Sequence, residues 1–111
     1  MKPKTPQAIE DCYQLLLWII PLLDQFPRNR KFSLGNRLES CLLDVLDDLL
    51  KARWKSNARQ NLSSANSHLD MVRHIWRLCH DLQIISTKRY EYGIRLMLGI
   101  GKQIGGWKNY K

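Results

Sequence analysis

The chain has little of what builds disulfide frameworks and zinc sites. Its three cysteines, Cys12, Cys41 and Cys79, are isolated from one another and form no C-x-x-C pair. Neither a zinc site nor a redox dithiol is therefore expected. Each cysteine falls in the apolar register of a predicted helix, which is typical of buried, reduced thiols in a cytosolic protein. The chain is accordingly predicted to be cytoplasmic.

Long apolar runs are also missing. The longest, residues 15–23, contains Pro21 and is too short to cross a bilayer. No apolar segment follows Met1 to Lys4, as a signal peptide would require. No contact with a membrane is therefore expected.

Patterns typical of catalysis and cofactor binding are lacking as well. His68, His74 and His80 are spaced by six residues, so successive side chains are rotated by about 240° on a helix and cannot share a metal site. Residues 99–106 are rich in glycine but follow no predicted strand, which argues against a nucleotide-binding loop. The carboxylates at 47–48 are explained more simply as a solvated helix surface than as a catalytic pair. We therefore predict no enzymatic activity, no cofactor and no metal.

What the chain has in excess is positive charge. Eighteen lysines and arginines outnumber ten acidic residues, and the formal net charge is +8 at pH 7. Such an excess favours a polyanionic partner, such as nucleic acid or an acidic protein surface. The length of 111 residues fits one domain, residues 1–111, and the 44% apolar content can fill a core without disulfides.

Apolar residues recur at intervals of three and four, which predicts helices at about residues 6–24, 33–54, 61–82 and 86–104. No segment alternates apolar and polar residues as a half-buried strand would. Four helices with short connections predict an all-α fold, an up-down-up-down four-helix bundle.

Local signals predict where these helices begin and end. Thr5 is a candidate N-cap of the first helix, with Pro6 in its first turn, and Ser33 is a candidate N-cap of the second. Pro21 is expected to kink or end the last turn of the first helix. The glycine pair at 105–106 predicts the end of the fourth helix.

The helix at 61–82 has two apolar stripes, where one buried face would need only one. Three explanations remain open: a wide core face, a very central helix buried on both sides, or a core on one side and a subunit contact on the other. The first stripe comprises Leu62, Ala65, Leu69, Val72, Trp76 and Cys79, and the second comprises Met71, Ile75, Leu78 and Leu82. On the fourth helix, cations recur every seven residues and must lie on one line, at Lys88, Arg95 and Lys102.

Ten cations fall in three groups: a basic loop after Pro27, the connection between the second and third helices, and the third helix itself. The first two groups are separated by about 30 Å, the length of a helix, so a single compact patch is not expected. We predict that these side chains bind RNA or DNA phosphates without recognition of the bases. They are Arg28, Arg30, Lys31, Arg37, Lys51, Arg53, Lys55, Arg59, Arg73 and Arg77. The candidate exposed aromatics for stacking bases are Trp54 and Tyr92.

Two segments together resemble a known family. Residues 26–35 read F-P-basic followed by F-x-L-G, and residues 100–107 read I-G-x-x-x-G-G-W. The chain resembles the small four-helix-bundle family that includes the accessory variability determinant of diversity-generating retroelements. The same family includes the proteins encoded by intervening sequences in bacterial 23S ribosomal RNA genes. The high positive charge favours the retroelement member.

The resemblance implies a homopentameric, barrel-like assembly with a basic surface. It further implies a non-enzymatic accessory protein that binds the element's reverse transcriptase and template RNA and supports mutagenic cDNA synthesis. The alternative is a structural or protein-interaction oligomer of the ribosomal-insert type, without a nucleic-acid role. In that case the basic surface would contact only an acidic partner protein.

Overall fold

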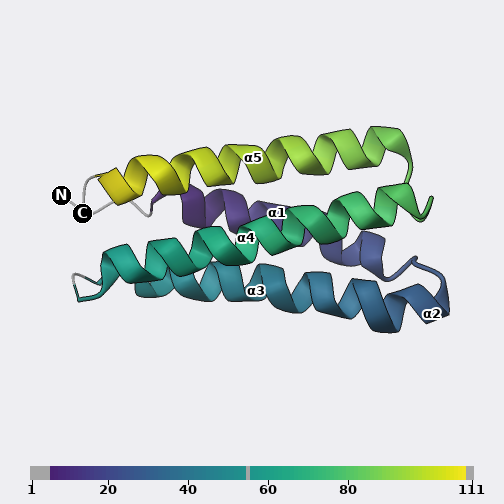
Figure 1. The fold of residues 1–111 in the computed structure, drawn as a ribbon, viewed down its shortest axis with the longest axis horizontal. Helices are drawn as coiled ribbons and strands as arrows, with labels where there is room; N and C mark the ends of the chain where they lie inside the picture. The colour runs from purple at the N-terminus through teal and green to yellow at the C-terminus, as the bar shows by residue number, and fades with distance from the viewer. Residues whose placement is uncertain (1–5, 55, 110–111) are drawn as a thin grey trace.

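The computed structural model describes residues 6–54 and 56–109, which contain helices and no strand. The four long helices are α1 (Gln7–Leu23), α3 (Asn36–Lys51), α4 (Ala58–Asp81) and α5 (Thr87–Asn109). They alternate in direction along the 45 Å long axis of the molecule (Figure 1). The all-α fold and the up-down-up-down order are therefore confirmed.

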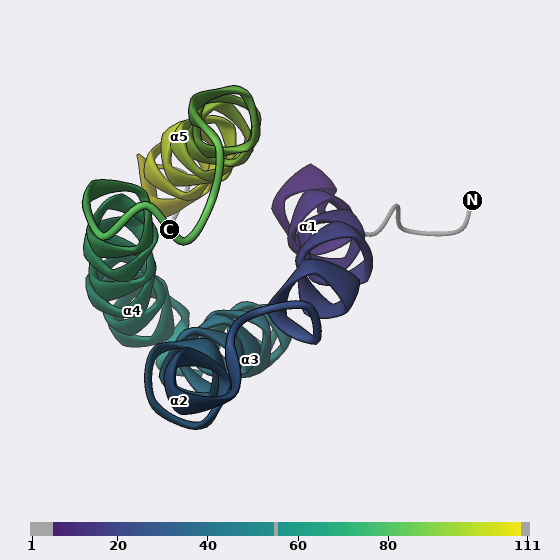
Figure 2. The same ribbon diagram turned by 90° about the vertical axis from the view of Figure 1, so that its right-hand side faces the viewer.

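Each long helix packs against two others. Both α1 and α4 lie between α3 and α5, so that the four helices surround one core (Figure 2). One end of the bundle holds the start of α1, the turn between α3 and α4, and the end of α5 (Figure 1). The opposite end holds α2 (Arg28–Arg30) and the turn between α4 and α5. No helix among the described residues is long and apolar enough to cross a membrane.

The predicted basic loop is wrong, because the chain is already helical from Arg28. The short helix α2 continues into one π-helical turn, η1 (Lys31–Gly35), and then into α3. Pro27 precedes the first turn, and its carbonyl accepts hydrogen bonds from the N–H groups of Arg30 and Lys31, both at 2.8 Å. A proline in this position costs the helix no hydrogen bond, since the first N–H groups have no partner within the helix.

Ser33 is consequently not an N-cap. Its hydroxyl donates to the carbonyl of Asn29 at 2.9 Å, within the helical segment, as serines in helix interiors do. The segment is held to the bundle by Phe26, which is buried, and by Gly35, which lies against Phe26 and Leu23.

Two other helix ends differ from prediction. The third helix, α4, begins at Ala58 rather than at about residue 61, after Asn57 in a left-handed conformation with φ 61°. The helix α5 (Thr87–Asn109) runs through both glycines at 105–106, so the predicted C-cap is wrong. Trp107 packs against the core from within this helix, and that packing favours continuation over the glycine stop.

The ends of α1 and α3 are close to prediction. α1 begins at Gln7, with Pro6 at the N-cap position; Thr5 lies outside the described residues. Pro21 lies in the last turn of α1, which ends two residues later at Leu23. α3 ends at Lys51, three residues before the predicted end.

The contact between α4 and α5 depends on a glycine. Trp76 is fully buried, and its indole N–H donates to the carbonyl of Tyr90 at 3.0 Å. A Cβ at Gly93 would lie 2.6 to 2.9 Å from three atoms of that indole. Only a residue without a side chain allows the ring to lie against the α5 backbone at this position.

Asp48 is buried, with 8% of its surface exposed, and the prediction that it belongs to a solvated face is wrong. Its carboxylate accepts a hydrogen bond from Nδ1 of His68 at 2.7 Å, which joins α3 to α4. Asp48 lies in register with Cys41 and Val45, which are also buried. The polar pair is tolerated because each member satisfies the other.

The three cysteines are buried and unpaired, in agreement with their predicted register. Burial raises the pKa of the Cys12 thiol to about 12 and that of Cys79 to about 11. The pKa of Cys41 is also raised, first by burial and then by the nearby carboxylate of Asp44. All three thiols are therefore held in the protonated form.

Replacement of Gly93 by alanine should lower the free energy of unfolding by about 1–2 kcal/mol, because the new methyl group overlaps the Trp76 indole. Gly99→Ala is the matched control in the same helix, since its new methyl group would have no atom within 4 Å. That variant should gain about 0.5–1 kcal/mol from helix propensity. Urea unfolding followed by circular dichroism measures both. Equal effects of the two substitutions would contradict the close contact.

The folded protein should resist alkylation by iodoacetamide at about pH 8, because only the thiolate reacts and the raised pKa values keep it scarce. Unfolding in urea should release all three thiols, and mass spectrometry counts the adducts. In the folded protein the pKa of Cys12 is about 12, above the ordinary value of 9.0. The buried, protonated Cys12 thiol therefore makes its full contribution to stability below pH 9.0, and that contribution is lost as the pH rises towards 12. Adducts on Cys12 or Cys79 of the folded protein would show that their burial is wrong.

Candidate nucleic-acid and subunit interfaces

The first group of predicted cations lies where α2 and η1 lead into α3. Arg28 and Arg37 are exposed, and Arg30 and Lys31 are half-buried. Lys31 has the Asp24 carboxylate at 3.9 Å. Within the described ranges, the three arginines have no carboxylate within 4 Å. Their charges are therefore available to an external anion, and they project from a helical turn.

An exposed aromatic ring accompanies this group and was not singled out as a contact from the sequence. Phe32 is 61% exposed, and the Lys31 ammonium lies 6.0 Å from its ring centroid. The π-helical turn places this ring beside the cations. The sequence could have indicated this exposed ring, because Phe32 directly follows Lys31 and precedes the periodic apolar face that begins at Leu34.

The second group lies at the other end of α3, around its turn to α4 (Figure 1). Lys51 pairs with Asp47 at 2.9 Å, and this hydrogen bond raises the pKa of Lys51. Arg53 donates to the carbonyl of Leu50 at 3.3 Å. Arg59, in the first turn of α4, donates to the carbonyl of Lys108 at 3.4 Å. Lys55 lies outside the described residues.

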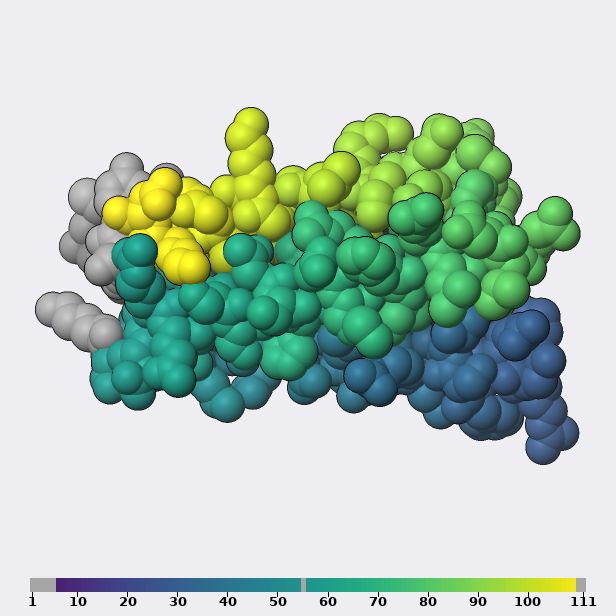
Figure 3. All heavy atoms as spheres, in the orientation of Figure 1, coloured from purple at the N-terminus to yellow at the C-terminus, as the bar shows by residue number. Residues whose placement is uncertain are grey.

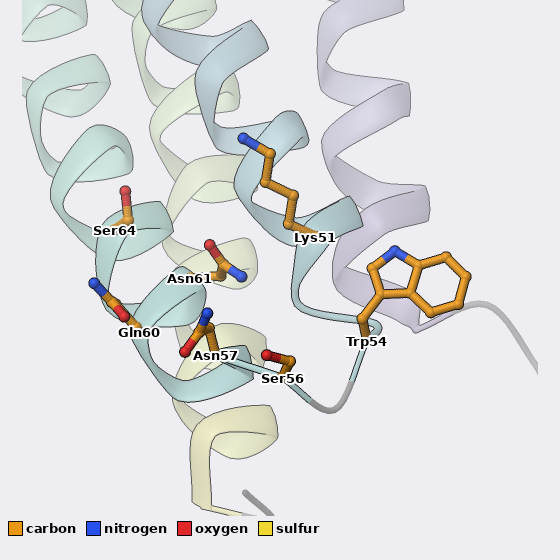
Figure 4. Close-up of a pocket in the computed structure, with 7 residues that line it drawn as sticks. All are labelled: Lys51, Trp54, Ser56, Asn57, Gln60, Asn61 and Ser64. Atoms are coloured by element: carbon orange, nitrogen blue, oxygen red, sulfur yellow. The ribbon is translucent and has the colours of Figure 1, made fainter.

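An open groove of about 470 Å³ lies at this turn (Figure 4). Trp54, which is 68% exposed, borders one side. The amide side chains of Asn57, Gln60 and Asn61 border the other, at the start of α4. Trp54 is thus confirmed as an exposed aromatic, but its ring points away from the amides.

The third group consists of Arg73 and Arg77 on α4, and both have partners within their own helix. Arg73 lies 3.0 Å from the Asp70 carboxylate, and Arg77 lies 3.8 Å from that of Asp81. Each cation is partly neutralised before any partner arrives. The fold therefore does not bring the three predicted groups together, since the first two lie at opposite ends of the bundle (Figure 1).

Three further cations lie on the first half of α5, at the same end of the bundle as α2 (Figure 1). Lys88, Arg89 and Arg95 are all exposed. In the part of the chain that the structure describes, none has a carboxylate within 4 Å. The seven-residue spacing of Lys88 and Arg95 in the sequence indicates that they lie on one line along the helix. Neither was included among the predicted contacts.

The two stripes of α4 have different surroundings. Every member of the first stripe is buried. In the second, Ile75 is buried, whereas Met71, Leu78 and Leu82 are 41%, 44% and 43% exposed. The explanation by one wide core face is therefore not supported. The outer side of α4 crosses the front of the molecule, where no other helix covers it (Figure 3).

The histidines have separate partners, as their spacing predicts. His68 contacts Asp48, His74 contacts the backbone carbonyl of Asp70, and His80 contacts the Thr87 hydroxyl. Among the described residues, no three histidine, cysteine or acidic side chains are grouped to hold a metal ion.

Comparison with known proteins identifies a family. A search of curated proteins finds no match. A family model described as bAvd-like matches residues 7–111. This agrees with the resemblance to the accessory variability determinant that residues 26–35 and 100–107 indicate. Because the match spans all four long helices, the chain belongs to the bAvd-like family.

Proposed function

We propose that the chain is a non-enzymatic accessory protein of a diversity-generating retroelement that binds the element's reverse transcriptase and template RNA. Membership of the bAvd-like family supports an accessory protein of this type. The observation that favours RNA as a partner is the group of arginines at the α2 end, Arg28, Arg30 and Arg37. They have no carboxylate within 4 Å in the described part of the chain, so folding leaves their charges for an external anion.

Phosphate binding follows from the position of these side chains. A helical turn holds their backbone fixed, and the arginine fork matches the geometry of phosphate oxygens. Each contact releases counterions from the RNA, which makes the affinity fall as salt rises. Contacts of this kind fix a strand in place without recognition of its bases.

Assembly into a pentamer is the second part of the proposal. It is supported by Met71, Leu78 and Leu82, which leave apolar surface exposed along α4. Exposed leucines and methionines in one stripe are typical of a subunit contact. A ring of subunits would also repeat each cationic end several times, and the separate groups of one chain would become a continuous basic surface.

The reverse transcriptase as partner is supported by family membership alone. The contact is testable by co-purification of the two proteins after nuclease treatment, which removes any RNA bridge between them. Retention of the enzyme after RNA removal is the result that the proposal requires.

Replacement of Arg28, Arg30 and Arg37 together by alanine should weaken RNA binding and reduce the slope of log affinity against log salt by about 2. The matched control replaces Lys51, Arg73 and Arg77, which changes the net charge equally but removes cations that already contact carboxylates. The control should reduce the slope by less than about 1. Filter binding with structured RNA over a salt series measures both.

Two results would contradict this part of the proposal. Equal slopes in the two triple variants would remove the special role of the arginines at the α2 end. An absence of RNA binding by the unaltered protein would favour the alternative, an oligomer of the ribosomal-insert type that contacts only proteins.

Light scattering should give about five times the chain mass of 13.1 kDa. Leu78→Asp should dissociate the assembly, because a charge in a buried apolar contact loses its hydration. Leu78 is 44% exposed in the single chain, so the fold itself should tolerate the change. Tyr13→Asp, at a 50% exposed position on α1, is the control for a surface charge. A monomeric unaltered protein would overturn the pentamer.

A further inference from the structure

A second pocket, whose lining includes none of the ten predicted contacts, lies between α1 and the first half of α5. It is open to solvent and has a volume of about 500 Å³. Aromatic rings line it from both helices, Trp18 from α1 and Tyr92 from α5. Three cations, Lys88, Arg89 and Arg95, complete the lining together with a single acid, Glu91, and Ser86.

The aromatic side of this pocket is fixed to the protein core. The ring of Tyr92 lies 4.8 Å from that of Trp18, centroid to centroid, and the ring of Trp18 lies 5.9 Å from that of Trp76. Trp76 is fully buried and hydrogen-bonded to α5. A series of rings therefore runs from the core to the surface, where Tyr92 is 44% exposed. A surface so supported is preorganised to stack against a flat ligand.

The cations that line this pocket form no ion pair within the described part of the chain. Within the described ranges, Lys88, Arg89 and Arg95 have no carboxylate within 4 Å, although Glu91 lies on the same helix. The first turn of α5 contains no acid. Cations in the first turn of a helix oppose its macrodipole, so Lys88 and Arg89 lower stability where they are. An anionic ligand would relieve both this repulsion and the mutual repulsion of the three cations.

We propose that this pocket binds one unpaired nucleotide of a single-stranded RNA. Its base stacks on Tyr92 beside Trp18, and the flanking phosphates contact Lys88, Arg89 and Arg95. Adjacent aromatic and basic side chains are the combination that single-stranded nucleic acids need, and stacking accepts any base. A duplex cannot use the rings, because its bases are already stacked and paired. This inference rests on the proposed RNA binding and adds a strand-selective contact to it.

The test compares a short fluorescent single-stranded RNA with a duplex of the same sequence. Tyr92→Ala should weaken single-strand binding about tenfold and leave its salt slope unchanged, since the residue carries no charge. Duplex binding should stay unchanged. Tyr92→Phe should bind as the unaltered protein does, because it keeps the ring. Tyr13→Ala is the matched control, a tyrosine on α1 that is 50% exposed and outside the pocket.

Arg95→Ala tests the cationic side of the same pocket. It should weaken the binding of the single strand and reduce its salt slope by about 0.7, the value for one phosphate contact to a single strand. The two variants together separate stacking from charge, because Tyr92→Ala changes affinity at every salt concentration and Arg95→Ala changes the slope.

Single-strand affinity equal in Tyr92→Ala and Tyr13→Ala would overturn the inference while the proposed RNA binding stands. Dissociation of the assembly by Tyr92→Ala in light scattering would also overturn it, since the pocket would then be part of a subunit contact. If the unaltered protein binds neither RNA, both the pocket and the wider RNA proposal are wrong.

Discussion

The contact between the Trp76 indole and the backbone at Gly93 determines how α4 and α5 pack. The ring is fully buried, and there is no room for a methyl group between it and α5. The indole also supports Trp18 of α1, so one side chain links three of the four long helices. Tyr92 is the neighbour of Gly93, and its position follows from the same contact. Core packing thereby fixes the aromatic side of a surface pocket.

The architecture could be predicted from the sequence, because apolar residues at intervals of three and four require helices with buried faces. The helix ends were harder, since each depends on a contact distant in sequence. Pro27 begins a helical segment that buried Phe26 holds to the bundle, and the glycines at 105–106 stay helical while Trp107 packs on the core. Asp48 was assigned to a solvated surface because of its charge, although its register with Val45 indicated burial.

The candidate interfaces could be predicted only in part. The sequence shows where cations gather, and it shows Lys51 four residues after Asp47. The same helical spacing indicates Asp70 as a partner of Arg73 and Asp81 as a partner of Arg77. What the sequence does not show is which cations lack a carboxylate after folding, because that also depends on residues brought close by the packing of other helices. The pocket at Tyr92 could not be predicted, since its rings come from the first and last long helices. Only the spatial arrangement joins Trp18 to Tyr92.

The π-helical turn at Lys31–Gly35 determines the direction in which Arg28 and Arg30 project from the bundle. A π-helical turn holds about one residue more than an α-helical turn. Each residue of an α-helix turns the chain by about 100°, so winding the same five residues as an α-helix would rotate everything before them by about that angle about the α3 axis. Arg28 and Arg30 would then face another direction with the same charge and the same neighbours in sequence. The π-helical winding of this segment, as much as its composition, therefore sets which side of the bundle presents its charge to a partner.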